Sequence, residues 1–280
     1  MPHTEQHAAL KYRRPVSTFG LGTRRRIVRP SPLFLVIVAV TAIGGVIAWT
    51  QQSAGSRLGD FGVFVLVLGG WVISVCFHEF AHAFAAYRAG DRSVEARGYL
   101  TLNPFKYAHP VLSLLLPLIA IVGGGFALPG GAVYLRPHTF RTRTSRALAA
   151  AVGPLTNLVL AVVLIVLWRH YGATGAHLRF WSGLAFLGFL QVSAAVLNLV
   201  PIPGLDGYAI IEPFLDPETR RLGGKVKPWG MLVVLLLLFY VNPIRDAFLH
   251  LVRIIHSALG GNDFFAVGYY FFQFWHNPAP

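Results

Sequence analysis

The sequence has little cysteine and little charge. One Cys among 280 residues leaves no partner for an intrachain disulfide and excludes a zinc site built from clustered cysteines. Charged residues make up only 12% of the chain, 55% of the residues are hydrophobic, and the mean hydropathy is +0.57. This balance is unusual for a soluble domain and is typical of a protein with several membrane-spanning helices. Because a cysteine cluster is excluded, any metal ligands must be His, Asp or Glu.

Acidic residues are also scarce, and the formal net charge is +13. A nucleic-acid-binding module would gather its basic residues on one soluble unit with helical or aromatic readers. Here Lys and Arg lie instead in short connections between apolar runs. We therefore expect no nucleic-acid partner, and we expect contact with the lipid bilayer.

Five apolar runs are each near the roughly 20 residues that a helix needs to cross a bilayer. They cover residues 33–50, 61–87, 147–168, 183–200 and 229–244. A sixth apolar segment, 111–135, contains two prolines and five glycines, so a single straight helix is not expected there. The sequence predicts an all-α polytopic membrane protein with five to six transmembrane helices. Residues 111–135 would re-enter the membrane as a half-helix followed by a glycine-rich hairpin, covered by protein or lining a wet cavity.

The distribution of basic residues predicts the orientation. If the N-terminus is cytosolic, 19 of the 24 Lys and Arg lie on the cytosolic side, as the positive-inside rule requires. We expect a multi-pass protein of the cell membrane with a basic cytosolic leader at residues 1–30. A membrane-embedded domain would follow at 31–250, with its core at 60–210, and an aromatic interfacial C-terminal tail at 251–280.

His78, Glu79 and His82 form an HExxH motif inside the second apolar run. The four-residue spacing puts both imidazoles on one helix face, where both can reach one zinc ion with Glu79 beside it. The alternative is a chance pair of core histidines. A charged side chain at mid-membrane costs roughly 2.5 to 3.5 kcal/mol, however, and this cost favours a functional role for Glu79.

Two histidines do not complete a catalytic zinc site, which typically has three protein ligands and one open position. Asp206 follows the fourth apolar run, on the side of the membrane where the two histidines are expected. Pro201 and Pro203 interrupt the helix before it, so the backbone can turn the carboxylate inward. Asp206 is the candidate third ligand, and a loop or N-cap aspartate is the alternative.

These motifs resemble those of the site-2 protease family of intramembrane zinc metalloproteases. HEFAH at 78–82 looks like the first signature of the family, and NLVPIPGLDG at 198–207 looks like the second. Between them, GYLTLNP at 98–104 and VGPLTN at 152–157 look like connecting segments of its compact bacterial branch, which lacks PDZ and CBS domains.

The resemblance implies roles for individual residues. His78, His82 and Asp206 would bind one zinc ion per chain, and Glu79 would be the catalytic base. Asn157 and Asn198 would lie near the reacting carbonyl. The resemblance implies an intramembrane zinc endopeptidase that hydrolyses peptide bonds in transmembrane segments of other membrane proteins, in regulated intramembrane proteolysis, near the cytosolic side. The rival is a non-catalytic membrane zinc-binding or transport protein on the same scaffold. A transporter is expected to show internal repeats, and none is visible.

The glycine-rich segment is the candidate substrate-binding region. A locally unwound transmembrane substrate can add to an exposed strand edge, and a merely flexible membrane turn is the alternative. The glycines concerned are Gly123, Gly124, Gly125, Gly130 and Gly131. The expected partners are a transmembrane protein substrate and the lipid bilayer, while an adaptor protein or a second copy of the chain is left open.

Overall fold

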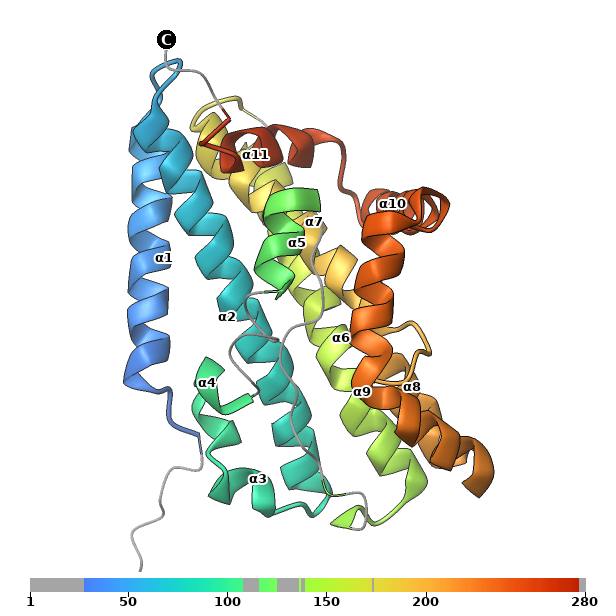
Figure 1. Cartoon of the computed structure of the whole chain (residues 1–280). Coiled ribbons are helices and arrows are strands. Elements are labelled where there is room, and N and C mark those ends of the chain that lie inside the picture. Colours follow the sequence, from blue (N-terminus) through green and yellow to red (C-terminus); the bar gives the residue numbers. More distant parts are fainter. Residues whose placement is uncertain (1–27, 108–115, 125–135, 137–138, 173, 277–280) are drawn as a thin grey trace, which may run out of the picture.

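The computed structural model describes residues 28–107, 116–124, 136, 139–172 and 174–276. Within these ranges the secondary structure is helical, and no strand occurs. Five of the described helices are long and apolar enough to cross a membrane, which confirms the predicted all-α class and the five predicted spans. They are α1 (Pro32–Thr50), α2 (Arg57–Ala89), α6 (Arg143–Leu167), α7 (Leu178–Asn198) and α9 (Pro217–Tyr240). Figure 1 shows them side by side, each running opposite to the one before it.

Shorter helices join and cover these spans. They are α3 (Ser93–Ala96), α4 (Pro104–Tyr107), α5 (Leu116–Gly124), α8 (Asp206–Ile211), α10 (Asn242–Ala258) and α11 (Phe264–Phe272), with single turns at Tyr99–Thr101, Trp168–Gly172 and Glu212–Phe214. The helix α10 runs through residue 250, where the sequence suggested the start of a separate tail.

The fifth span begins earlier than the apolar pattern predicts. The Asp216 side chain accepts hydrogen bonds from the backbone N–H groups of Glu218 and Thr219, and Pro217 occupies the first helical position. Both features favour a helix start. The basic stretch 220–227 is therefore helical and continues directly into the apolar part of α9.

The helix α7 lies at the centre of the bundle. Of its apolar window, 94% is buried, compared with 22% for α9. It packs against α2, α6 and α11 and is buried around nearly its whole circumference, its few polar side chains included. Its last residue is Asn198, so the chain leaves the most enclosed helix directly before the segment that carries Asp206.

Small residues let α1 and α2 approach closely. A Cβ at Gly44 would lie 2.7 Å from Val65 Cγ1, and a Cβ at Gly62 would lie 2.7 Å from the backbone nitrogen of Ala48. Glycine contacts of this kind are common between helices in membranes. The opposite face of α1 is exposed and apolar, so it suits contact with lipid.

A buried ion pair joins the start of α7 to the start of α2. Arg179 of α7 donates to Asp60 of α2 at 2.7 Å, and the two side chains are only 6% and 4% exposed. The same guanidinium donates to the carbonyls of Gln51 and Ser53 at 3.0 Å. One side chain therefore ties α7 to α2 and to the loop between α1 and α2.

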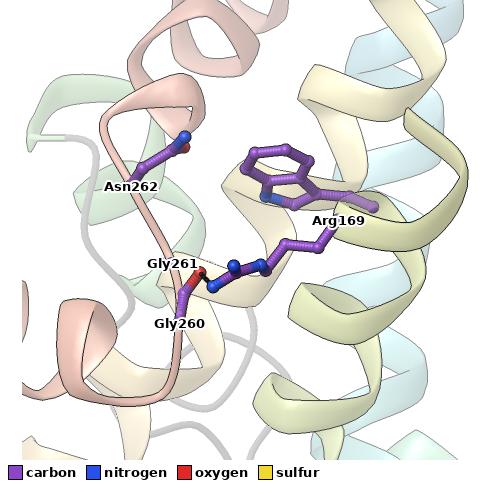
Figure 2. Close-up of a pocket in the computed structure, with 5 residues that line it drawn as sticks. Arg169, Gly260, Gly261 and Asn262 are labelled. Carbon is purple, nitrogen blue, oxygen red and sulfur yellow. Dashed lines mark hydrogen bonds between the residues drawn. The ribbon is translucent and has the colours of Figure 1, made fainter. Parts of the chain in front are cut away.

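A second arginine connects the end of α6 to the loop between α10 and α11. Figure 2 shows Arg169 beside Gly260, Gly261 and Asn262, and its guanidinium donates to the Gly260 carbonyl at 2.8 Å. The residues line a small pocket together with Trp168, whose ring contacts Phe264. The C-terminal aromatic residues are thus packed onto the bundle.

The two described flanks of the segment around α5 lie at the same end of the bundle, and the re-entrant path of the segment stays a prediction. On one flank Tyr107 donates to the Tyr99 carbonyl at 3.1 Å, and on the other the backbone of Arg136 donates to Asp91 at 3.0 Å. Both contacts lie at the C-terminal end of α2, while α5 lies further along the bundle (Figure 1). Ala120 and Ile121 of α5 are fully buried, and nine helical residues span about 14 Å, half of a bilayer core. The glycine-rich hairpin at 125–135 lies outside the described residues and stays a prediction.

Asp91 anchors this end of the bundle, a role that the sequence did not reveal. Its carboxylate accepts from the hydroxyl and the backbone N–H of Ser93, at 2.6 and 3.0 Å, as well as from Arg136. Burial alone would raise the pKa of Asp91, but these donors outweigh burial and hold its pKa below the ordinary value. An ionised Asp91 therefore joins the turn after α2 to the segment that leads into α6.

Candidate metal centre

His78, His82 and Asp206 meet inside the bundle. The Nε2 atoms of the two histidines are 3.0 Å apart, and Asp206 Oδ2 lies 3.1 Å from His78 Nε2 and 3.3 Å from His82 Nε2. Both histidines are 6% exposed and lie one turn apart on α2, whereas Asp206 is the first residue of α8. The structure thus brings the three sequence-predicted ligands together across 124 positions of the chain.

Hydrogen bonds fix the orientation of the two imidazoles. His82 Nδ1 lies 2.7 Å from the carbonyl oxygen of Ala149, which can only accept, so Nδ1 carries the proton and Nε2 keeps its lone pair. His78 Nδ1 lies 2.6 Å from the amide oxygen of Asn157 and donates in the same way. Each imidazole therefore turns its Nε2 atom towards Asp206.

The resulting group could hold a metal ion. Two imidazole lone pairs and a carboxylate oxygen repel one another unless a cation lies between them. Two histidines and one carboxylate form a common donor set for catalytic zinc, and tetrahedral bonds of about 2.0 Å place ligand atoms about 3.3 Å apart. The observed separations of 3.0 to 3.3 Å agree with this value.

Gly153 of α6 provides the space for the two imidazoles. A Cβ at this position would overlap His82 Nε2 and would lie 2.7 Å from His78 Nε2. The next residue, Pro154, lies inside the helix and has no N–H to donate to the Ala150 carbonyl one turn earlier. Gly153 and Pro154 together shape the wall of the site.

The segment before Asp206 makes the inward turn that Pro201 and Pro203 suggested. Gly204 adopts a φ of +108°, which a glycine tolerates without strain, and the backbone N–H of Leu205 donates to the Ile202 carbonyl at 3.0 Å. A Cβ at Gly207 would overlap the Leu199 carbonyl. The start of α8 is therefore pressed against the end of α7, and this contact directs Asp206 towards α2.

The helix α9 covers the same segment from the other side. A Cβ at Gly204 would lie 2.8 Å from the Lys227 carbonyl, and a Cβ at Gly230 would overlap the Pro203 carbonyl. Asp206 is thus carried on a segment held between α7 and α9.

Glu79 lies beside the metal-binding group. It follows His78 on α2 and is only 2% exposed. The short helix α4 packs against α2, where Tyr107 lies in one buried cluster with Cys76. The position of Glu79 matches the one expected for an acid–base residue next to a bound metal.

Comparison with known proteins agrees with this geometry. The chain is 56% identical over 214 residues to "Putative zinc metalloprotease Rip2" of Mycolicibacterium smegmatis, covering 76% of this chain and 82% of the relative. It is 46% identical over 254 residues to the protein of the same name from Mycobacterium tuberculosis, covering 90% and 96%. "Putative zinc metalloprotease YwhC" of Bacillus subtilis is 34% identical over 186 residues, covering 62% and 78%.

The chain belongs to the site-2 protease family. No family model and no solved structure matches it. The relatives are named as zinc metalloproteases, and the described residues of this site-2 protease contain a matching group of possible ligands. Metalloprotease activity therefore rests both on sequence identity over most of the chain and on the geometry of the site.

Asn157 and Asn198, the other candidate catalytic residues of this site-2 protease, are both buried. The amide oxygen of Asn157 accepts from His78, and its amide nitrogen donates to Gln191 at 3.1 Å. Asn157 therefore contacts His78 at Nδ1, and its contact with the reacting carbonyl stays a prediction. Asn198, at the end of α7, is 6% exposed, and its contact with the carbonyl stays a prediction.

The predicted substrate-binding glycines are only partly described. Gly123 and Gly124 form the end of α5, and a Cβ at Gly123 would meet the ring of Phe239 of α9 at 3.9 Å. Gly125, Gly130 and Gly131 lie outside the described residues, so their role stays a prediction. Sequence reasoning missed Gly153, Ser74 and Gln191. The last two are visible in the sequence as polar residues inside apolar runs, although the sequence does not show what they contact.

Proposed function

We propose that the chain is an intramembrane zinc endopeptidase that hydrolyses peptide bonds in transmembrane segments of other membrane proteins. The observation that carries the proposal is the triangle of His78, His82 and Asp206 beside Glu79, enclosed by membrane-spanning helices. A metal-binding protein without hydrolytic activity needs the three ligands but does not need a buried acid–base residue next to them. The position of Glu79 therefore favours catalysis over zinc binding or transport.

The residues of the site would have different roles in hydrolysis. His78, His82 and Asp206 would hold one zinc ion, which supplies a Lewis acid that polarises the scissile carbonyl and lowers the pKa of a water molecule. Glu79 would take a proton from the attacking water and pass it to the leaving nitrogen. Asn157 and the Ala149 carbonyl hold the imidazoles in orientation through their Nδ1 atoms. Asn198 would be a donor near the reacting carbonyl.

A transmembrane helix must unwind before its carbonyl can reach this site, because its peptide groups are internally hydrogen-bonded. We propose that the glycine-rich segment after α5 binds the unwound substrate as an added strand. The distribution of basic residues supports a cytosolic N-terminus and a site near the cytosolic side. The substrate would therefore be cut near its cytosolic end.

The test compares two glutamates at the same end of the bundle. Purified protein in detergent should contain one zinc per chain and cleave a transmembrane peptide, and Glu79→Gln should keep the zinc but lose about 10²- to 10⁴-fold in cleavage rate. Glu95→Gln, on the exposed surface of α3, should leave both unchanged. Zinc binding without cleavage of any transmembrane peptide by the parent would favour the non-catalytic zinc-binding or transport protein.

A further inference from the structure

A chain of hydrogen bonds runs from the backbone of α2 through α7 and α6 to His78. The Ser74 hydroxyl donates to the Trp71 carbonyl at 2.7 Å, and Gln191 Nε2 donates to Ser74 Oγ at 2.9 Å. Asn157 Nδ2 donates to Gln191 Oε1 at 3.1 Å, and Asn157 Oδ1 accepts from His78 Nδ1 at 2.6 Å. Ser74, Gln191 and Asn157 are 4%, 0% and 4% exposed, so these bonds are shielded from solvent.

The donor and the acceptor in each of these hydrogen bonds follow from the first bond, in which Ser74 contacts the Trp71 carbonyl. A backbone carbonyl can only accept, so the Ser74 hydroxyl must give its proton to Trp71 and can then only accept from Gln191. Gln191 must therefore turn its NH₂ group to Ser74 and its oxygen to Asn157. Asn157 must then turn its own oxygen to His78. The reverse orientation of either amide would bring two acceptors or two donors face to face in a buried site, which costs free energy.

We propose that Gln191 and Ser74 are positioning residues for the metal ligand His78. The inference rests on the proposed function, because it concerns the readiness of the same site to hold zinc. Through Asn157, the two residues keep the proton of His78 on Nδ1 and the lone pair on Nε2. They touch neither substrate nor metal, and they act by fixing which of the two nitrogens carries the proton.

Loss of these hydrogen bonds would change the nitrogen of His78 that carries the proton. Without the oxygen of Gln191, the amide of Asn157 can turn by half a rotation and offer its NH₂ group to His78 Nδ1. Nδ1 would then accept, and the proton of a neutral His78 would lie on Nε2, the atom that must bind the metal. Zinc would bind only after this arrangement is reversed, so its affinity falls.

The test measures zinc affinity by competition with a chromogenic chelator in detergent. Gln191→Met preserves the length of the side chain and removes both hydrogen bonds, and Ser74→Ala removes one oxygen atom. Partners of metal-binding histidines typically contribute 10- to 100-fold to metal affinity. We expect zinc affinity to decrease at least about 10-fold in Gln191→Met and about 3-fold in Ser74→Ala. Because Ser74→Ala removes only one atom, we expect this variant to form the native structure in any case.

Ser182→Ala is the matched control. Ser182 is also fully buried in a spanning helix, and its hydroxyl also donates to a carbonyl three residues earlier, that of Arg179, at 3.2 Å. It has no contact with the chain of hydrogen bonds that ends at His78. Its replacement should leave zinc affinity unchanged, which separates the proposed role from a general effect of losing a buried hydroxyl.

A double-mutant cycle shows whether Gln191 acts through Asn157. If it does, Gln191→Met should have little further effect on zinc affinity once Asn157→Leu is present. Equal losses in both backgrounds, or full zinc affinity in folded Gln191→Met and Ser74→Ala, would overturn the inference. Those results would leave the proposed function intact, because the parent would still bind zinc and cleave. A parent that binds no zinc would overturn both.

Discussion

The two ends of the bundle bury polar groups in different ways. At one end, Nε of the positive Arg179 donates to the negative Asp60, and its Nη1 donates to the carbonyls of Gln51 and Ser53. Opposite charges meet directly at this end. At the other end, two imidazole lone pairs and the carboxylate of Asp206 face one another, and the protons of the imidazoles point away.

The difference separates a structural site from a candidate active site. Buried charges that serve stability are paired with opposite charges and hydrogen-bonded to completion. A buried set of acceptors that converge on one point is unfavourable by itself and is explained by a cation that it binds. The comparison predicts that substitutions at the metal end change zinc binding, whereas substitutions at the ion-pair end change the free energy of unfolding.

The largest effect is expected from Gly153→Ala. The added methyl group would overlap His82 Nε2 and crowd His78 Nε2, so we expect zinc binding and cleavage to be abolished. Gly224→Ala, on α9, is the matched control, because a Cβ at that position meets nothing within 4 Å. Zinc content of the purified proteins measures the effect. A Gly153→Ala protein with full zinc content would contradict this prediction, because it would show that the residues around position 153 can move to accommodate the methyl group.

The next effect concerns the ion-pair end. Arg179→Met removes the guanidinium that Asp60 contacts, and removal of one partner of a buried pair costs about 3 to 5 kcal/mol. We expect a lower thermal unfolding temperature in detergent and an unchanged zinc affinity. The double variant Asp60→Leu, Arg179→Met should recover most of the stability. If zinc affinity fell together with stability in the single variant, the two ends would be coupled, and the comparison would be wrong.

The smallest effect is expected at the turn before Asp206. Gly204 and Gly175 both have positive φ values, +108° and +78°, but only at Gly204 does a Cβ meet a neighbour, the Lys227 carbonyl at 2.8 Å. Gly175→Ala should cost about 1 kcal/mol of stability through backbone strain alone. Gly204→Ala should cost about 1 to 3 kcal/mol and also weaken zinc binding, since the displaced turn carries Asp206. Equal zinc affinity in both variants would contradict this link.

Much of the fold and the three ligand candidates can be predicted from the sequence because each has a local signal. Apolar length gives the five spans, the four-residue spacing gives the shared face of His78 and His82, and two prolines indicate the turn before Asp206. The start of α9 was missed because its basic residues suggest a connecting loop. Asp216 followed by Pro217 was the signal for an earlier start.

The remaining parts of the site depend on contacts between distant helices. A glycine inside an apolar helix has many explanations, and the sequence does not show that Gly153 of α6 faces the histidines of α2. Ser74 and Gln191 stand out as polar residues in apolar runs, but the bond between them joins positions 117 residues apart. Asn157 was identified as important, yet its place behind His78 follows only from the packing of α6 against α2.

The contact between α9 and the turn at Pro203 and Gly204 has a consequence for biosynthesis. His82 of α2 is made 124 residues before Asp206, and the segment that carries Asp206 is covered only when α9 is in place. A ribosome-bound chain that has inserted its first four spans therefore carries two ligands in position and a third on an uncovered turn. We expect the metal centre to be completed only with the fifth insertion, so that a partly made chain does not yet hold zinc.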